Sequence, residues 1–277
     1  MQPLSYDHFG RHLAHRLAQF LEPEEAGAES RCWLEEGLGL SRAWLAAHGD
    51  DPVPPGQVLQ VEGWLERRRL GEPWSYILGW APFRGRRFRV TPATLIPRPE
   101  TELVLEAALD LGRRLKVLHA CDIGTGSGIL AISMALETDW AVVATDVSAG
   151  ALAVAQGNAA DLGARVRFRQ GDLLDAVADP VGLVVSNPPY VDPADEPGLQ
   201  RELAFEPRGA LFAEDGGLAL STRLLQQAHR RSAPGCVLEI GAGQGDALQA
   251  RARAAGWRRV AVHQDLAGHD RILMALR

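Results

Sequence analysis

The residues Asn187-Pro188-Pro189-Tyr190 are the part of the sequence best suited to chemistry, because they combine hydrogen-bond acceptors with a stiff backbone. Two consecutive prolines remove two backbone donors, so the Asn187 side-chain oxygen and the Pro188 carbonyl can be held as acceptors. Such a pair suits a planar NH2 group, whose nitrogen is a poor nucleophile while its lone pair is delocalised. Acceptors on both hydrogens favour a pyramidal nitrogen and direct its lone pair at an electrophile, and Tyr190 can stack on the planar group. The alternative is a proline-rich turn that ends in a packed tyrosine.

A glycine-rich segment upstream suits a nucleoside ligand. Asp122-Ile123-Gly124-Thr125-Gly126-Ser127-Gly128 joins an apolar run to a helical pattern, and its glycines permit a tight turn and close approach of a ligand to the backbone. Asp146 follows Gly124 by 22 residues, where its carboxylate can accept both ribose hydroxyl hydrogens. This combination does not distinguish NAD from S-adenosylmethionine.

Alternating strands and helices position these two motifs. The pattern predicts strands over 117–122, 141–146, 166–170 and 183–186, with helices over 129–136 and 149–162. Strands separated by helices build a parallel sheet that is covered on both faces, and ligands bind at its carboxyl edge. We therefore expect an open α/β nucleotide-binding fold in which the loop after 183–186 lies beside the glycine turn.

The chain ahead of this sheet predicts a separate helical unit. Apolar residues at helical spacing place Phe9, Leu13, Leu17, Phe20 and Leu21 on one face, and Val58, Leu59, Val61, Leu65 and Leu70 follow later. Residues 81–97 favour an extended hairpin. We expect a helical substrate-recognition domain over 1–80, a hairpin linker over 81–97 and the α/β domain over 98–277.

Composition restricts the functional classes. Hydrophobic residues make up 46% of the chain, which is typical of a globular protein. The formal net charge is −6, and this acidic charge disfavours sequence-independent binding to nucleic acid. No apolar run approaches the roughly 18 residues of a membrane helix, and no secretion signal precedes the helical unit, so we expect a cytoplasmic protein. Cys32, Cys121 and Cys236 have no metal-ligand spacing and are expected to be core thiols, and no metal site is expected.

Several motifs together give the chain a resemblance to release-factor glutamine methyltransferases of the HemK or PrmC type. They are Gly71-Glu72-Pro73 with Tyr76-Ile77, the stretch from Leu95 to Glu102, Asp122 to Gly128, Ser186 to Tyr190, Glu206-Pro207, and Asp265 to Arg271. The resemblance covers nearly all of residues 70–277. Residues 187–190 alone are shared with enzymes that methylate amino groups of DNA and RNA, whereas the stretch 96–102 is far more specific.

This resemblance implies a class I S-adenosylmethionine-dependent methyltransferase domain with a Rossmann-like fold, preceded by a small helical bundle that helps bind the release factor. The substrate would be the glutamine of the Gly-Gly-Gln motif, methylated on its side-chain amide. Gly124, Thr125, Gly126, Ser127 and Gly128 would bear the methionine part of the cofactor, Asp146 the ribose, and Asp172 and Leu173 the adenine. Asn187 would contact cofactor and substrate, with Pro188, Pro189 and Tyr190 completing the glutamine pocket. Family members often have an aromatic residue in place of Leu173, and Phe-Asp in place of Val181-Gly182.

Two alternatives remain open. The same loop fits an adenine N6-methyltransferase acting on nucleic acid, although the acidic charge and the lack of a basic recognition domain disfavour it. A non-catalytic cofactor-fold binding module is the second, and the intact Asn187 and Tyr190 disfavour it. We expect no direct nucleic acid contact, no membrane contact, and a monomer.

Two further features need an explanation. A second glycine turn, Gly241-Ala242-Gly243-Gln244-Gly245, with Asp265 behind it, repeats the cofactor pattern, but we expect the crevice to be occupied by the first turn and the 187–190 loop. A basic strip, Arg84, Arg86, Arg87 and Arg89, either pairs with acidic residues of this chain or helps dock an acidic release factor.

Overall fold

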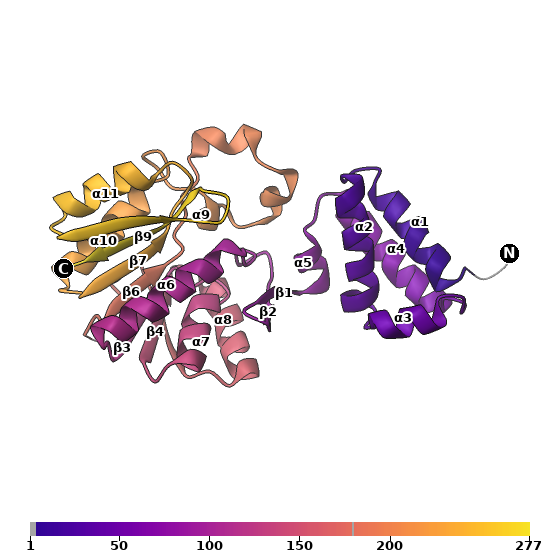
Figure 1. Ribbon diagram of the computed structural model, residues 1–277, viewed down its shortest axis with the longest axis horizontal. Helices are drawn as coiled ribbons and strands as arrows, with labels where there is room; N and C mark the ends of the chain where they lie inside the picture. The colour runs from indigo at the N-terminus through magenta and orange to yellow at the C-terminus, as the bar shows by residue number, and fades with distance from the viewer. Residues whose placement is uncertain (1–3, 179) are drawn as a thin grey trace. The chain divides into compact units, whose positions relative to one another are not determined.

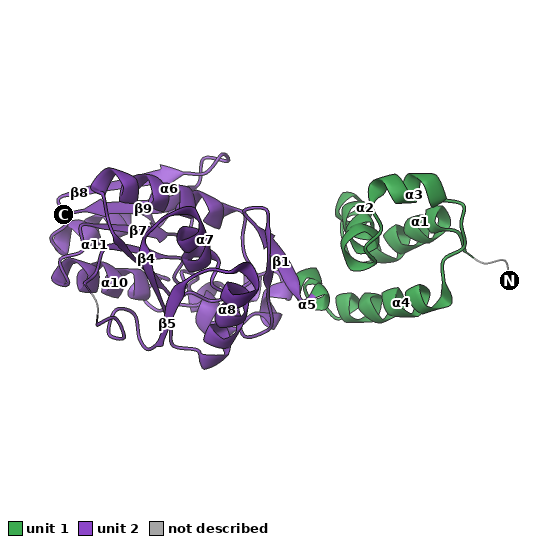
Figure 2. Cartoon of the chain, turned by 90° about the horizontal axis from the view of Figure 1, so that it is seen from below, with its two compact units in different colours: residues 1–78 green, residues 79–277 purple. Residues whose placement is uncertain are grey.

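The chain divides into two units with separate cores, residues 1–78 and residues 79–277 (Figure 2). The computed structural model describes residues 4–178 and 180–277. Within these ranges no helix combines the length and the apolar character needed to cross a membrane.

The first unit is a bundle of helices around a tryptophan-centred core. Its elements are α1 (Tyr6–Leu17), α2 (Pro23–Cys32), the π-helical turn η1 (Trp33–Gly37), α3 (Arg42–His48), α4 (Pro55–Arg69) and α5 (Trp74–Leu78). Prolines at the first position of α2 and α4 suit helix starts, because the missing N–H would have no partner there. Trp33 is fully buried and stacks on Trp74 with ring centroids 4.8 Å apart. The helical bundle expected from the sequence is confirmed.

Four details of that expectation are wrong. Cys32 is exposed, because the neighbouring Trp33 takes the buried position at the end of α2, whereas Cys121 and Cys236 are buried. Phe20, Leu59 and Leu70 are also exposed, at 36%, 74% and 56% of their surface. Phe20 lies beyond the last residue of α1, Leu17. Leu59 comes two residues before Val61 and Leu70 five residues after Leu65, so helical geometry turns both away from the buried face of α4.

The hairpin of β1 (Trp80–Phe83) and β2 (Arg86–Arg89) belongs to the second unit and is not a separate linker. Phe83 and Phe88 are buried in the core of this unit, with ring centroids 6.0 Å apart. The buried Asn158 side chain accepts from the Arg89 N–H and donates to the carbonyl oxygens of Arg89 and Ser127. This one amide therefore joins the hairpin to the glycine turn.

Three arginines of the basic strip form ion pairs within the second unit. Arg84 and Arg86 both reach Glu137, at 3.5 and 2.8 Å, and Arg84 also contacts Glu106 at 2.8 Å. Arg89 contacts Asp161 at 2.7 Å. The Arg87 guanidinium lies 4.2 Å from the ring centroid of Trp80. The structure therefore favours intramolecular pairing over docking as the role of this strip.

The second unit contains a seven-stranded sheet in the order β5-β4-β3-β6-β7-β9-β8, in which only β9 runs antiparallel. The strands are β3 (His119–Ile123), β4 (Ala141–Asp146), β5 (Val166–Gln170), β6 (Leu183–Ser186), β7 (Gly235–Glu239), β8 (Arg259–Gln264) and β9 (Asp270–Leu276). The α/β class and the strands predicted over 141–146, 166–170 and 183–186 are confirmed.

Helices cover both faces of this sheet (Figure 1). The helices α6 (Glu100–Leu115), α7 (Ile129–Glu137) and α8 (Ala149–Leu162) pack on one face, while α10 (Ala219–Arg230) and α11 (Gly245–Ala254) pack on the other. Alternate residues of each buried strand face the two cores: Ala120 contributes to the first and Cys121 to the second. Between β6 and α10 the chain forms η2 (Pro193–Gly198), η3 (Arg201–Phe205) and the short α9 (Arg208–Leu211).

We predict that Asn158→Ala lowers the free energy of unfolding by about 2–4 kcal/mol, because it leaves buried backbone groups of the hairpin and of the glycine turn without partners. Asp161→Ala, on the same helix as Asn158, is the matched control. It removes only the exposed ion pair with Arg89 and should cost under about 1 kcal/mol. Urea denaturation measures both values. Equal effects of the two variants would contradict a structural role for Asn158.

Candidate functional site

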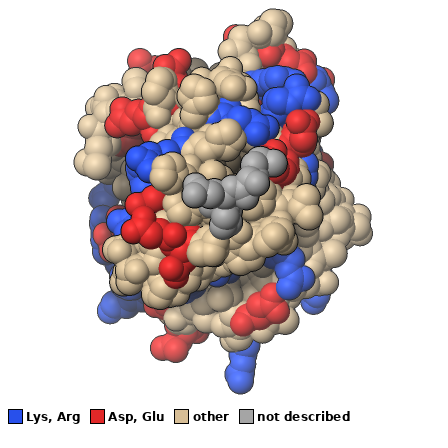
Figure 3. Space-filling model, turned by 90° about the vertical axis from the view of Figure 1, so that its right-hand side faces the viewer, with Lys and Arg blue, Asp and Glu red and all other residues tan. Residues whose placement is uncertain are grey.

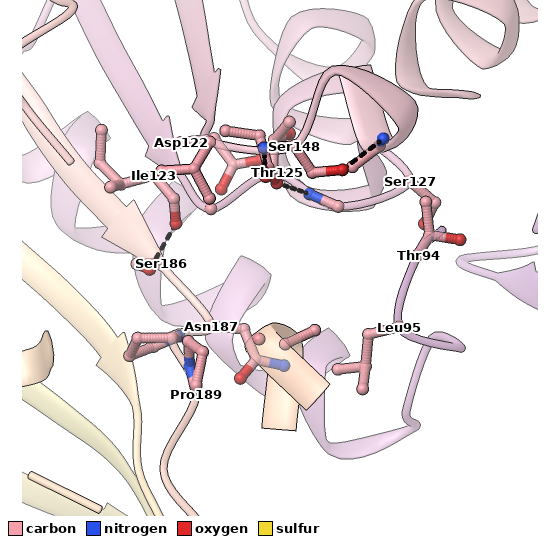
Figure 4. Close-up of a pocket in the computed structure, with 18 of the residues that line it drawn as sticks. Thr94, Leu95, Asp122, Ile123, Thr125, Ser127, Ser148, Ser186, Asn187 and Pro189 are labelled. Carbon is pink, nitrogen blue, oxygen red and sulfur yellow. Dashed lines mark hydrogen bonds between the residues drawn. The ribbon is translucent and has the colours of Figure 1, made fainter. Parts of the chain in front are cut away.

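A cavity of about 240 Å³ lies at the carboxyl ends of β3, β4 and β6 (Figure 4). Strand order reverses between β3 and β6, which is where open α/β sheets bind ligands. Ten of the twelve site residues proposed from the sequence line this cavity: Gly124, Thr125, Gly126, Ser127, Asp146, Asp172, Leu173, Asn187, Pro188 and Pro189. Gly128 and Tyr190 are not among the described lining residues.

Gly128 lies where the glycine turn becomes α7, and both its backbone conformation and its packing require glycine. Its φ of 88° is left-handed, and a Cβ at this position would lie 2.8 Å from the Ile132 side chain and 3.1 Å from the Ala155 Cβ. A side chain would therefore force α7 away from α8. The structure thus shows a packing reason for glycine at this position, and the expected cofactor contact of Gly128 stays a prediction.

Asp146 presents a carboxylate whose orientation is fixed by the backbone. Its Oδ2 accepts from the Gly126 N–H and its Oδ1 from the Ser148 N–H, both at 2.9 Å. Each carboxylate oxygen has a further acceptor site, so both can still bind a hydroxyl hydrogen in the cavity. This geometry fits two neighbouring hydroxyls of a ribose.

Asp122 is a buried carboxyl group in the same cavity wall. Its Oδ2 accepts from the Thr125 hydroxyl at 2.6 Å and from the Ala131 N–H at 3.0 Å. The buried Oδ1 has no hydrogen-bond partner among residues 4–178 and 180–277. Burial, reinforced by the charge of Asp146, raises the pKa of Asp122 to about 7 despite the two donors.

The end of the cavity formed by residues 171–173 follows β5. The Asp172 carboxylate pairs with Arg223 at 2.5 Å. Leu173 has a φ of 47°, an uncommon conformation for a residue with a side chain, and its carbonyl accepts from the Thr145 hydroxyl at 3.0 Å. Leu173 lines the cavity with this strained backbone.

The loop 187–190 begins beside the glycine turn. The Ser186 hydroxyl donates to the carbonyl oxygen of Ile123 at 2.5 Å and so joins the ends of β6 and β3. The Asn187 Nδ2 donates to the Thr101 hydroxyl at 3.2 Å, and its Oδ1 forms no hydrogen bond in the described part of the chain. Asn187 therefore has a free acceptor oxygen at the cavity.

The Tyr190 side chain is held by a carboxylate on β7. Its hydroxyl donates to the Glu239 Oε1 at 3.3 Å, and burial raises the pKa of this hydroxyl above its usual range. Its carbonyl oxygen accepts from the Gln244 Nε2 at 2.9 Å. Tyr190 therefore contacts β7 and the second glycine turn, and its place in a glutamine pocket stays a prediction.

Several residues around the cavity escaped the reasoning from chemistry. Thr101 lines the cavity, and its hydroxyl donates to the buried Glu239 at 2.7 Å. Glu206 accepts from the Ile96 N–H at 2.9 Å and pairs with Arg98, which holds the segment 95–98 in the cavity wall. Local sequence offered one indication of these contacts, because Thr101 and Glu206 lie in the motifs that carry the family resemblance.

Comparisons with protein families match both units. A family model described as the PrmC N-terminal domain matches residues 11–79, and one described as the methyltransferase small domain matches residues 101–231. The release factor glutamine methyltransferase of Bordetella pertussis is 47% identical over 249 residues, which are 88% of this chain and 92% of that protein. The protein of the same name from Salmonella typhimurium is 35% identical over 95% of this chain and 97% of its own length.

Solved structures show the same fold at low sequence identity. The catalytic domain of hMettl16, in complex with a MAT2A 3′UTR hairpin, has a TM-score of 0.59 and 16% identity, covering 80% of this chain and 82% of that one. A methyltransferase from Pyrococcus furiosus has a TM-score of 0.52 and 16% identity, covering 78% and 98%. These similarities concern the Rossmann-like methyltransferase architecture alone.

The raised pKa of Asp122 predicts a pH-dependent stability. The folded chain holds this proton more tightly than the unfolded chain, so the stabilisation is complete below the ordinary pKa of 3.8 and is lost as pH rises through about 7. Between about pH 5 and 8 the ligand-free protein should lose roughly 2–3 kcal/mol of stability through this group, and Asp122→Asn should remove that part. Asp110→Asn, at an exposed carboxylate, is the control. Urea midpoints that fall equally in the wild type and in Asp122→Asn would contradict the assignment.

Proposed function

The chain belongs to the release factor glutamine methyltransferase family, and we infer that it transfers a methyl group from S-adenosylmethionine to the side-chain amide nitrogen of a release-factor glutamine. It is an S-adenosylmethionine-dependent protein-(glutamine-N5) methyltransferase. The observation that carries this inference is the position of Asn187, whose free amide oxygen lies in the same cavity as the glycine turn and Asp146. The acceptor suited to an amide NH2 and the turn suited to a nucleoside thus share one cavity.

The cavity fits the cofactor. When bound, S-adenosylmethionine supplies a methyl group on a positively charged sulfonium. Three carboxyl groups, those of Asp122, Asp146 and Asp172, line the cavity, and the buried Oδ1 of Asp122 has no partner among the described residues. A cationic ligand compensates this arrangement. In our proposal residues 124–127 bind the methionine part, Asp146 the ribose, and Asp172 with Leu173 the adenine.

The residues of the 187–190 loop orient the substrate. Asn187 Oδ1 and the Pro188 carbonyl accept the two hydrogens of the glutamine NH2, which favours a pyramidal nitrogen and directs its lone pair at the methyl carbon. These hydrogen bonds are stronger in the transition state than in the planar ground state, and so they lower the barrier. No general base is required, because the methylated amide is transiently cationic and can lose its proton to water. Pro189 restricts the backbone of the loop, and Tyr190 anchors the loop through its hydrogen bond to Glu239.

The helical unit 1–78 would help bind the release factor. Its contact would be with the release-factor domain that presents the Gly-Gly-Gln loop. The face drawn in Figure 3 carries basic and acidic side chains interspersed among uncharged ones. A continuous basic field, as binding to phosphate backbones requires, is not seen on that face. We propose that the protein acts as a cytoplasmic monomer without direct contact with nucleic acid.

The experiment that tests the proposed function compares three substrates. Radiolabelled methyl transfer from S-adenosylmethionine to purified release factor should exceed transfer to DNA and to tRNA, and a release factor with its glutamine replaced should accept none. Methylation of DNA or tRNA alone would favour the adenine N6-methyltransferase. Cofactor binding without any transfer would favour the non-catalytic module.

For Asn187→Ala we predict a fall in methyl transfer of about a hundredfold or more, since an acceptor placed for the transition state contributes a few kcal/mol. Binding of S-adenosylmethionine, measured by calorimetry, and thermal unfolding should change little by comparison. Near-normal turnover would contradict the mechanism.

For Asp146→Ala we predict weaker binding of S-adenosylmethionine by about 1–3 kcal/mol, from the loss of charge-assisted hydrogen bonds. Asp139→Ala, at an exposed aspartate outside the cavity, is the matched control and should bind as the wild type does. An unchanged dissociation constant for Asp146→Ala would place the ribose elsewhere.

A further inference from the structure

Behind the cavity, a chain of hydrogen bonds leads from a buried glutamate to Asn187. We propose that Glu239 and Thr101 are positioning residues that orient the Asn187 amide so that its oxygen, and not its NH2, faces the substrate. This inference rests on the proposed function and names two residues outside the 187–190 loop that its chemistry needs.

The contacts join three distant segments. Glu239 ends β7 and is 1% exposed, while Thr101 lies in the first turn of α6 and is fully buried. The Thr101 hydroxyl donates to Glu239 Oε2 at 2.7 Å, and Asn187 Nδ2 lies 3.2 Å from the Thr101 Oγ1. Tyr190 donates to the other oxygen of Glu239 at 3.3 Å. One carboxylate therefore contacts the 187–190 loop directly through Tyr190 and indirectly through Thr101.

The donor capacities set the direction of this chain. An ionised carboxylate only accepts hydrogen bonds, so the single Thr101 hydroxyl hydrogen must be directed at Glu239. The Thr101 oxygen can then only accept from Asn187, which has to present its NH2 and not its oxygen. The Asn187 oxygen is thereby left on the other side of the amide. Without this constraint the two ends of the amide are nearly equal in shape, and either could face the substrate.

The hydrogen bonds have this direction when Glu239 is ionised, and the surroundings of Glu239 determine the pH at which that occurs. Burial raises the pKa of Glu239 to about 7, and the charge of Glu100 adds to this shift. The donors Thr101 and Tyr190 and the positive charge of Arg271 oppose it. Assays at about pH 8.5 therefore keep Glu239 ionised and the direction of the chain defined.

The strand that carries Glu239 also explains the second glycine turn. Gln244 donates to the carbonyl oxygens of Tyr190 and Gly216, and its own side-chain oxygen accepts from the Gly241 N–H. β7 and the turn after it therefore hold Tyr190 by both its side chain and its backbone. This segment supports the substrate loop and has no need of a nucleoside ligand.

The first test removes the hydroxyl link. Thr101→Val keeps the shape of the side chain but lets the Asn187 amide turn, so kcat with release factor should fall about tenfold or more while the KM for release factor changes less than about threefold. Thr101→Ser keeps the hydroxyl and should restore kcat to within about threefold of the wild type. Ser133→Ala is the control, because it removes a buried hydroxyl that has no partner in the described part of the chain.

The second test reverses the direction of the hydrogen bonds that link Asn187 to Glu239 through Thr101. In Glu239→Gln the new amide can donate to Thr101, so the Thr101 hydrogen is free to turn to Asn187, and kcat should fall as far as in Thr101→Val. The double variant should be no slower than either single variant, because both break the same chain. Thermal unfolding with and without S-adenosylmethionine identifies a variant that has lost its fold. If the Glu239→Gln variants do not fold, the comparison of Thr101→Val with Thr101→Ser tests the inference by itself.

The outcomes separate this inference from the proposed function. A wild type that methylates release factor while Thr101→Val keeps wild-type kcat overturns the inference alone, as does a Thr101→Ser variant as slow as Thr101→Val. A wild type that does not methylate release factor overturns the proposed function.

Discussion

The adjacency of β3 and β6 is the constraint on which the site depends. β3 pairs with β4 on one side and with β6 on the other, so the chain after β3 and the chain after β6 serve opposite halves of the sheet. Their ends open into one crevice, and the hydrogen bond from Ser186 to the Ile123 carbonyl fixes how closely the two loops approach. The turn at 124–127 and the loop at 187–190 are 63 residues apart in the chain, yet they can cooperate because of this pairing.

The sequence was a good guide wherever the structural cause is local. Buried parallel strands are continuous apolar runs between helices, so Ala141–Asp146 and Leu183–Ser186 could be predicted with their bounds. The hairpin is different, because its membership of the second unit depends on Asn158 and on the burial of Phe83, contacts made far along the chain. In the helical unit, Leu59 and Leu70 are exposed because they are not at i+3 or i+4 spacing from the buried Val61 and Leu65, so helical periodicity already separates them from the core face.

The site follows the same division. Asp146 and Asn187 could be identified because a glycine turn and a proline pair restrict the backbone in recognisable ways, whereas the contact between Thr101 and Glu239 spans 138 residues and has no local pattern. Val181-Gly182, where family members often have Phe-Asp, also has a structural consequence. A Cβ at residue 182 would lie 1.8 Å from the His119 carbonyl oxygen, so the aspartate often found there in the family would require β6 to begin farther from β3. In this chain the glycine permits the close approach.

The two glycine turns show why a motif needs its neighbours before it has a function. Both follow a buried parallel strand, and both are trailed by an aspartate at nearly the same distance. The first turn follows β3, where strand order reverses, and its backbone faces a cavity. The second follows β7, which lies between β6 and the antiparallel β9, and Gln244 of the turn itself accepts from the Gly241 N–H. A turn whose donor is already bound by its own side chain has less to offer an incoming nucleoside, and its remaining contacts are to Tyr190. The same local geometry therefore suits a cofactor site after β3 and a support for the substrate loop after β7.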